Sequence, residues 1–537
     1  MISSIIKKEW LKLKFYFFAM ITIIVAFVGY FAFNLDFAFS TIEPESMMWY
    51  KFAHLNDKPY FYLSYLFLAI AMVISFAQFI PERIQRRIKI MAHLPLNLRD
   101  ALFMHLFIGI CFIAILTSIL AIGLLSVLVN YYPQEVIEVA FKDTLFYTFI
   151  SFVFYIGLSA VIIETKNTIA FAKFIIIALF VVIFLKVEYN TKDILWGAFL
   201  IFIPFLALDS FYSIKQQRLG SLIFKSSVVV VIICLIYFAY INYTQNYKRT
   251  FNKYYIFYSN VINDFVYQKN FGDHQFEYGI KDKKTFDRIE YESYLPFVYW
   301  RNLDIQKKLP IVIAKNSFDK KTIKASRLGF GYNPSMLKKL EVGLFPLLNP
   351  QSDKGMIKFP EEVFSIDKKG IKIYDFDHGL LADQIDDLTV KLAKVDFKYP
   401  AIGIWGKSTN MKPYDKGYLV LDSNKNLFNI SKENSVTRVK KVDVPKGIDL
   451  AFIKLSENRQ RVLSGYAIDK KSNFYLLTWD FKFIKLQLDN FDYKKMKLKL
   501  ISNPLNYLIR YDDGKSYYAC VFSKDSEYKK IKSVNLE

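Results

Sequence analysis

The chain contains little cysteine, histidine, glycine or proline. Its 3 cysteines (Cys111, Cys234 and Cys520) and 5 histidines are scattered over 537 residues. Neither a disulfide framework nor a metal-ligand set can be built from that spacing. With only 20 glycines and 16 prolines, the chain is neither collagen-like nor disordered. No catalytic triad or pair of catalytic carboxylates stands out. We therefore expect no enzyme, no catalytic residues, no metal and no cofactor.

Acidic residues are also scarce, with 49 Asp and Glu against 71 Lys and Arg, for a net charge of +22. A basic balance can indicate nucleic acid or anionic lipid as a partner. However, Lys far outnumbers Arg, and Ile, Phe, Asn and Tyr are abundant, and a biased base composition of the gene is the favoured explanation of this profile. We expect no nucleic-acid partner. Attraction to anionic lipid headgroups is a weaker alternative.

Apolar residues are plentiful, at 53% of the chain, and the mean hydropathy is +0.20. This composition predicts a membrane protein. About 20 apolar residues are needed for a helix to cross a bilayer. Seven such runs occur: Phe15–Leu35, Tyr60–Ile80, Ala101–Val129, Thr144–Ile163, Thr168–Val187, Ile194–Phe211 and Leu222–Tyr243. We expect a transmembrane bundle over residues 1–243 and a second domain over 244–537.

Lys and Arg in the loops predict the orientation, because they concentrate on the cytoplasmic side. With the N-terminus inside, the inner segments hold 14 of them: Lys7, Lys8, Lys12, Lys14, Arg83, Arg86, Arg87, Lys89, Arg99, Lys166, Lys173, Lys215, Arg218 and Lys225. The outer loops hold 5: Lys51, Lys58, Lys142, Lys186 and Lys192. The first run is too long for a cleaved signal peptide. Seven crossings of the bacterial inner membrane then place residues 244–537 outside the cytoplasm.

Two short segments on the expected cytoplasmic side have amphipathic patterns. In the first, Lys7, Lys8, Glu9 and Trp10 belong to a helix with one apolar face, which predicts a helix in the membrane interface. A plain positive flank that fixes topology is the alternative. The second segment, Glu82–Leu96, has apolar residues at helical spacing, an acid in its first turn, and Pro95 at its end. We expect a cytoplasmic helix there.

The order of these segments resembles the permease subunit of ABC-2-type transporters. The resemblance covers roughly residues 1–215 and rests on a Lys-Glu-Trp elbow, a long first outer loop and a Glu-Arg helix ending in Leu-Pro. In that family the elbow lies on the membrane surface, and the Glu-Arg helix couples the permease to a separate ATPase subunit. The resemblance thus implies coupling through Glu82, Arg83, Arg86, Arg87, Leu94 and Pro95. It further implies a cytosolic ATPase partner and a homodimer or a paired permease.

This chain departs from the family pattern at two points. Arg86 and Arg87 stand where the family commonly has Gly-Thr, and the seventh helix is additional. Three ionisable residues inside the apolar runs, His105, Glu164 and Asp209, lie near the inner ends. We expect them to reach water by snorkelling. No run carries a central row of charges, which argues against an ion channel or a proton relay.

The second half shows alternating patterns and turn signals, which predict a mainly β domain. Three stretches place an Asp before a polar turn, at Asp422, Asp469 and Asp512, with spacings of 47 and 43 residues. Ile366–Ile371 resembles a fourth such hairpin. This period is typical of β-propeller blades. A set of unrelated hairpins is the alternative.

Two motifs in this half resemble binding sites, but we assign no binding function to them. Ala401–Ser408 mimics a phosphate-binding loop, but its first glycine is missing and no helix-forming stretch follows. An acidic patch suits a hard cation or a polar turn, and the turn is favoured because EF-hand spacing is absent. Its residues are Asp375, Asp377, His378, Asp383, Asp386 and Asp387.

Two functions follow from the sequence. The first is a transporter permease subunit whose outer domain docks a substrate or a periplasmic protein. The second is a non-transporting, membrane-anchored β-platform for protein interaction or assembly. The amphipathic cytoplasmic segment favours the first, since an inert anchor needs no such helix.

Overall fold

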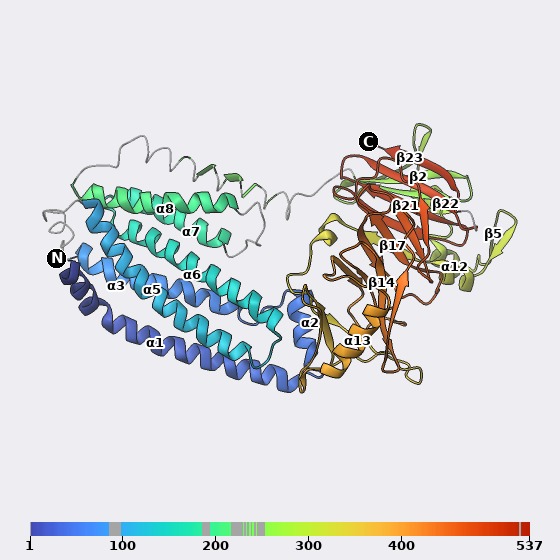
Figure 1. The fold of residues 1–537 in the computed structure, drawn as a ribbon. Helices are drawn as coiled ribbons and strands as arrows, with labels where there is room; N and C mark the ends of the chain where they lie inside the picture. Colours follow the sequence, from blue (N-terminus) through green and yellow to red (C-terminus); the bar gives the residue numbers. More distant parts are fainter. Residues whose placement is uncertain are drawn as a thin grey trace. The chain divides into compact units, whose positions relative to one another are not determined.

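The computed structural model describes residues 2–84, 98–184, 194–215, a few positions between 229 and 243, 253–525 and 528–536. The chain forms two compact units, Met1–Lys248 and Arg249–Glu537. The first is helical and the second is mainly β (Figure 1). The expected domain boundary near residue 244 lies outside the described residues, as does most of the expected seventh helix.

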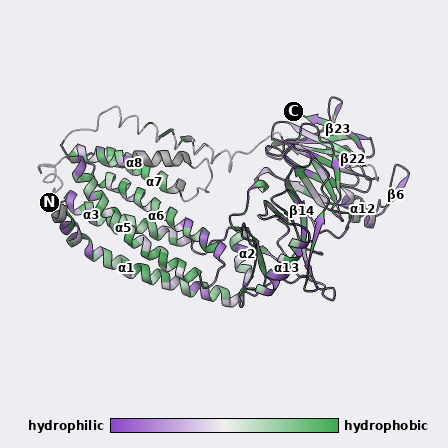
Figure 2. Ribbon diagram, viewed as in Figure 1, coloured by the Kyte–Doolittle hydropathy of each residue, from purple (hydrophilic) through white to green (hydrophobic). Residues whose placement is uncertain are grey.

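The helical unit consists of long antiparallel helices and shorter connecting ones. Its elements are α1 (Ile2–Thr41), α2 (Ser46–Leu55), η1 (Phe61–Leu63), α3 (Ser64–Ile84), α5 (Leu98–Leu128), α6 (Gln134–Ile163), α7 (Asn167–Phe184), α8 (Ile194–Tyr212) and η3 (Ser213–Lys215). Figure 2 shows hydrophobic residues along most of α1 and α5, with hydrophilic ones at the start of α1.

Four helices are long and apolar enough to cross a membrane: Ser4–Thr41, Phe61–Ile84, Arg99–Leu128 and Gln134–Ile163. They coincide with the first four runs of the sequence. The fifth and sixth runs are helical as well, but their described apolar helices are shorter, at Asn167–Val181 and Ile203–Tyr212. The sequence therefore predicts the helical half correctly, whereas seven crossings are not established.

Helix α1 is much longer than the predicted run. Its 40 residues extend for about 60 Å, roughly twice the thickness of a hydrocarbon core. The helix includes Lys7 to Trp10 without a break, so the predicted interfacial segment forms the first turns of α1 and not a separate helix. The Trp10 ring stacks on Phe112 of α5, with centroids 5.9 Å apart. This contact anchors the start of α1 to the bundle.

The β unit is built from antiparallel meanders. Four-stranded sheets contain β1–β4 (Lys253–Ser259, Asp264–Gly272, Gln275–Ile280, Lys284–Phe286), β8–β11 (Phe345–Pro346, Val363–Ile366, Ile371–Asp375, Gly379–Leu380), β12–β15 (Gly403–Gly406, Tyr418–Leu421, Leu427–Glu433, Val436–Val442) and β16–β19 (Leu450–Leu455, Leu463–Asp469, Phe474–Thr478, Phe483–Leu486). A five-stranded sheet joins β20–β23 (Lys497–Ser502, Asn506–Asp512, Tyr517–Ser523, Lys530–Leu536) to β7 (Gly329–Tyr332).

These sheets pack face to face in the order β8–β11, β12–β15, β16–β19, β20–β23 and β1–β4, so the first sheet of the chain packs on the last, and the inner sheets are buried on both faces. In β13, Tyr418 and Val420 face the core shared with the β8–β11 sheet, and Leu419 and Leu421 face the core shared with the β16–β19 sheet. Further shared cores join the β16–β19 sheet to the β20–β23 sheet, and that sheet to β1–β4. Burial on both faces explains why these strands read as continuous apolar runs.

The hairpin between the second and third strands recurs with the same chemistry. Asp422 and Asp469 each accept the backbone N–H four positions later, at 2.7 and 2.8 Å, from Asn426 and Asn473. Asp367 likewise accepts the backbone N–H of Gly370, at 3.0 Å. The predicted equivalence of these hairpins is confirmed. In the β21–β22 hairpin, however, the residue that accepts the turn N–H groups is Asp513 and not the predicted Asp512.

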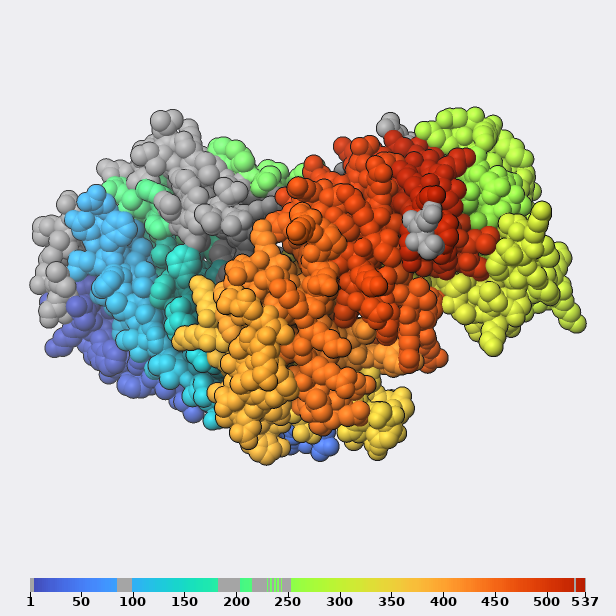
Figure 3. Space-filling model, turned by 45° about the vertical axis from the view of Figure 1, so that its right-hand side comes forward, coloured from blue at the N-terminus to red at the C-terminus, as the bar shows by residue number. Residues whose placement is uncertain are grey.

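Short elements complete the β unit. They are α10 (Arg288–Ser293), α11 (Trp300–Ile305), β5 (Ile311–Ile313), β6 (Asn316–Phe318), α12 (Lys320–Ser326), η4 (Pro334–Leu337) and α13 (Ala382–Lys394). Figure 3 shows the lobe with β5, β6 and α12 in yellow-green beside the red C-terminal strands. Phe297, Trp300 and Ile323 contribute to a small core of its own.

Candidate functional site

Glu82, the acid of the predicted coupling segment, lies at the end of α3 and contacts the start of α1. Its Oε1 atom is 2.8 Å from Nζ of Lys8 and 3.1 Å from Nζ of Lys12. The Glu82 side chain is only 2% exposed. The structure thus joins the two segments that the sequence singled out. Because Glu82 is buried and paired with lysines, it lies within the bundle and not on a free surface.

Glu9 extends this cluster to a third helix. Its Oε1 atom accepts a hydrogen bond from Lys12 at 2.8 Å and lies 3.7 Å from Nε2 of His105 on α5. The Glu9 side chain is fully buried. We call Lys8, Glu9, Lys12 and Glu82 the α1–α3 ion cluster. Its two carboxylates balance its two ammonium groups, which makes burial of these charges tolerable.

Arg83 points to another helix. One of its guanidinium nitrogens donates to Oδ1 of Asn167, the first residue of α7, at 3.4 Å. The Glu82-Arg83 pair therefore contacts α1 on one side and the start of α7 on the other. Lys7 is exposed beside the cluster. The remaining predicted coupling residues, Arg86, Arg87, Leu94 and Pro95, lie outside the residues that the structure describes.

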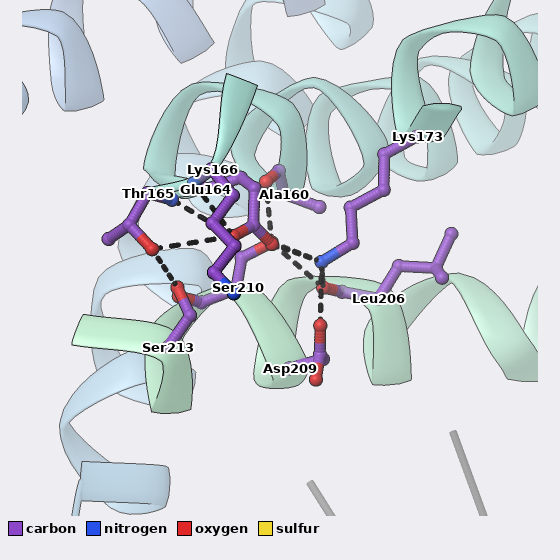
Figure 4. A network of polar contacts seen from close by, with 9 residues as sticks. All are labelled: Ala160, Glu164, Thr165, Lys166, Lys173, Leu206, Asp209, Ser210 and Ser213. Carbon is purple, nitrogen blue, oxygen red and sulfur yellow. Dashed lines mark hydrogen bonds and ion pairs between the residues drawn. The ribbon is translucent and has the colours of Figure 1, made fainter. Parts of the chain in front are cut away.

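A second ionic network centres on Lys173 of α7 (Figure 4). Its Nζ atom lies 2.8 Å from Oε2 of Glu164 and 2.9 Å from Oδ2 of Asp209. It also donates to Oγ of Ser210 at 2.7 Å and to the carbonyl of Leu206 at 3.2 Å. Both carboxylate side chains are fully buried, and that of Lys173 is 2% exposed. Two carboxylates thus share one ammonium group between α6, α7 and α8.

The predicted snorkelling of Glu164, Asp209 and His105 is wrong. Glu164 and Asp209 are buried against Lys173, and His105 is 3% exposed with its Nδ1 atom 2.8 Å from the carbonyl of Ala101. The charge rule alone predicts Lys173 as one of the charges of an inner segment. Its position inside the apolar run of α7 was the available signal, because an intramembrane ionisable residue marks a paired or functional site.

The opposite end of the bundle holds a further buried carboxylate. Asp143 of α6 accepts hydrogen bonds from Nζ of Lys58 at 2.8 Å and from the hydroxyl of Tyr60 at 2.7 Å. Trp49 of α2 donates to the carbonyl of Tyr131 at 2.7 Å. These contacts fix the loops between α1 and α3 against the α5–α6 turn, so both ends of the bundle are held by polar bonds.

The motifs of the β unit that were set aside form ordinary structure. Asp375 accepts the N–H groups of Asp377 and His378, both at 3.0 Å, as a polar turn does. No group of metal-ligating side chains occurs among the residues searched, which are those that the structure describes. Ala401–Ser408 contains the edge strand β12. The polar turn at Asp375 and the strand at Ala401–Ser408 agree with the sequence interpretation.

The comparisons with known proteins concern the β unit alone. Residues 255–520 match a family described as a domain of unknown function, DUF4857. No curated protein and no solved structure matches the chain. The match begins at β1 and ends within β22, so it covers nearly all of the packed sheets.

Proposed function

We propose that the chain is the membrane permease subunit of an ABC-2-type transporter, powered by a separate cytosolic ATPase. In this proposal the chain itself hydrolyses no ATP. Two permease protomers, identical or paired, form the transport unit. The β unit lies outside the cytoplasm and docks a substrate or a periplasmic protein.

The observation that carries the proposal is the position of Glu82 and Arg83. They end α3 and lead into the segment 85–96, which is the expected docking site. Through Lys8 and Lys12 the pair contacts α1, and through Asn167 it contacts the start of α7. A displacement of this segment would therefore move the end of α3, and these contacts would transmit the movement to α1 and α7 as a rigid displacement. Such a linkage is what a coupling element requires.

The same contacts support the topology of the proposal. The start of α1, the end of α3 and the start of α5 meet at the α1–α3 ion cluster, and the end of α6 meets α8 at Lys173. These are the ends that the charge rule places inside. We propose seven crossings with the N-terminus in the cytoplasm of a bacterial cell. The five packed sheets are the blades of an open, propeller-like domain.

Purification from native membranes tests the proposal. The tagged chain should co-purify with an ATP-hydrolysing subunit, and the complex should hydrolyse ATP. Cysteine labelling of intact cells should modify exposed positions of the β unit, such as Lys368→Cys, and leave Arg83→Cys protected. A chain that is folded but purifies without any ATPase would refute the transport role.

The membrane-anchored β-platform remains the second candidate. It is favoured by the family match, which covers the β unit and none of the long apolar helices. The platform needs no ATPase and no movement of the helices. It predicts that replacing residues 1–243 by an unrelated seven-helix anchor preserves function, whereas the permease proposal predicts that function is lost.

A further inference from the structure

The β unit contains a hollow whose walls carry an excess of positive charge. Its volume is about 830 Å³. Three segments line it: the turn before β5, helix α12 with the residues that follow it, and the loop between β16 and β17. This volume lies within the range of roughly 300–1,000 Å³ that is typical of small-molecule sites.

Five of the lining side chains are basic and one is acidic. The basic ones are Lys320, Lys321, Lys324, Arg327 and Arg459. The acid, Asp319, accepts the backbone N–H of Thr322 at 2.8 Å and so begins α12. Lys320 is paired with Asp304 at 2.6 Å. The other four cations form no ion pair within the described part of the chain.

The backbone that carries these cations is fixed. The side-chain amide of Gln460 donates to the carbonyl of Arg327 at 2.7 Å, and this bond ties the β16–β17 loop to the end of α12. The carbonyl of Ser326 accepts the hydroxyl of Ser502 at 2.7 Å and Nζ of Lys524 at 3.4 Å. The positions from which these side chains extend are therefore set before a ligand binds, which reduces the ordering that binding requires.

The rest of the wall is mostly apolar, with Asn458 and Gln460 as its uncharged polar residues. Leu309, Pro310, Ala325 and Leu328 line the hollow beside the cations. Guanidinium and ammonium groups prefer phosphate oxygens, and arginine can bind them with two parallel hydrogen bonds. A ligand that satisfies both parts of the wall has an anionic head and a hydrocarbon portion.

We propose that this hollow binds a phosphate-bearing amphiphile. The inference goes beyond the transport proposal and does not depend on it, because a platform protein could use the same site. A polyanionic polymer is a different ligand and fits less well, since the wall of the hollow is partly apolar. Some exposed lysines elsewhere on the surface are paired with a neighbouring acid, as Lys391 is with Asp387 at 2.6 Å.

Calorimetric titration of the full chain in a neutral detergent tests the site. The probes are hexyl phosphate, inorganic phosphate and hexanol. We expect hexyl phosphate to bind most tightly, inorganic phosphate more weakly, and hexanol not measurably. Equal affinity for the two phosphates would overturn the apolar part of the proposal. No binding of either phosphate would overturn all of it.

Two double variants identify the location. Lys324→Glu with Arg327→Glu should weaken hexyl phosphate binding by about tenfold or more, the effect of losing one or two charge-assisted hydrogen bonds. The control, Lys368→Glu with Lys369→Glu, makes the same charge change on an exposed hairpin and should leave the affinity nearly unchanged. Equal weakening in both variants would mean that general surface charge, and not the hollow, attracts the ligand. Because all four side chains are exposed, both variants should keep the melting temperature of the parent.

Discussion

Nζ of Lys8 lies 2.8 Å from Oε1 of Glu82, and this ion pair joins the first turns of α1 to the last turn of α3. Lys12 contacts the same oxygen at 3.1 Å. The sequence motifs that suggested an elbow and a coupling helix are therefore parts of one cluster. This relationship connects the last turn of α3 directly to α1.

Loss of the Glu82 carboxylate should destabilise the bundle. Glu82→Gln removes the carboxylate that Lys8 and Lys12 share, whereas Glu9 still contacts Lys12, which is largely buried. Because Lys8 is partly exposed, we expect the free energy of unfolding to fall by about 1–3 kcal/mol, with a lower melting temperature. Glu138→Gln, at an exposed position of α6, is the control and should have no effect. An unchanged melting temperature for Glu82→Gln would contradict the structural role of the cluster.

Removing the ammonium group of Lys173 should lower the free energy of unfolding more than removing one of the two carboxylates that it contacts. Lys173→Met leaves Glu164 and Asp209 buried without their shared cation, and the loss of a buried partner costs about 3–5 kcal/mol. Asp209→Asn keeps the Lys173–Glu164 pair and should cost less. The triple variant Lys173→Met, Glu164→Gln, Asp209→Asn removes all charge and should recover stability relative to Lys173→Met. Additive losses in the triple variant would show that the three groups act independently.

The β unit should become more stable as the pH rises above about 8. Burial lowers the pKa of Lys524 from its usual value near 10.5 to about 8. Between these two values the unfolded chain binds more protons than the folded one, so stability rises with pH across that window. Lys524→Met should raise the melting temperature at pH 7 and remove this rise. The exposed Lys446→Met is the matched control. Identical pH profiles for Lys524→Met and the parent would contradict the assignment.

The recurring hairpin acids should contribute unequally. Asp469 is buried and accepts hydrogen bonds from Asn473, Tyr475 and the N–H of Lys471. Asp469→Ala leaves these donors without their acceptor and should lower the free energy of unfolding by about 1–3 kcal/mol. Asp513 is exposed and accepts only backbone N–H groups. Asp513→Ala should cost clearly less, and thermal melts of the two variants compare them directly.

The fold was predictable where local pattern and burial coincide. Four helices and the hairpin acids Asp422 and Asp469 follow from apolar length and from turn chemistry, which are local properties. The shift from Asp512 to Asp513 was not predictable, because both are acids at the same turn and strand register decides between them. Residue spacing alone could not reveal which sheets pack together.

The ionic sites were only half predictable, since they depend on contacts between distant helices. Glu82 stood out through its motif, but nothing local indicates that Lys8 and Lys12 bind it. Lys173 was taken for a loop charge because positive charge near an inner helix end also fits the topology rule. Its two acids, Glu164 and Asp209, lie on other helices, and tertiary packing alone brings them together.

The most direct test of the central claim measures how much ATPase subunit co-purifies with charge-reversed chains. Arg83→Glu with Arg87→Glu inverts the charge of the proposed docking segment, whereas Lys51→Glu with Lys142→Glu makes the same change at the predicted outer end. If the segment after α3 docks the ATPase, the first variant should insert in the membrane with its orientation kept but should lose most of the ATPase and its ATP turnover, because charge complementarity is inverted. The second variant should keep both. Full yield and full turnover with the first variant, in its normal orientation, would contradict the docking role of this segment.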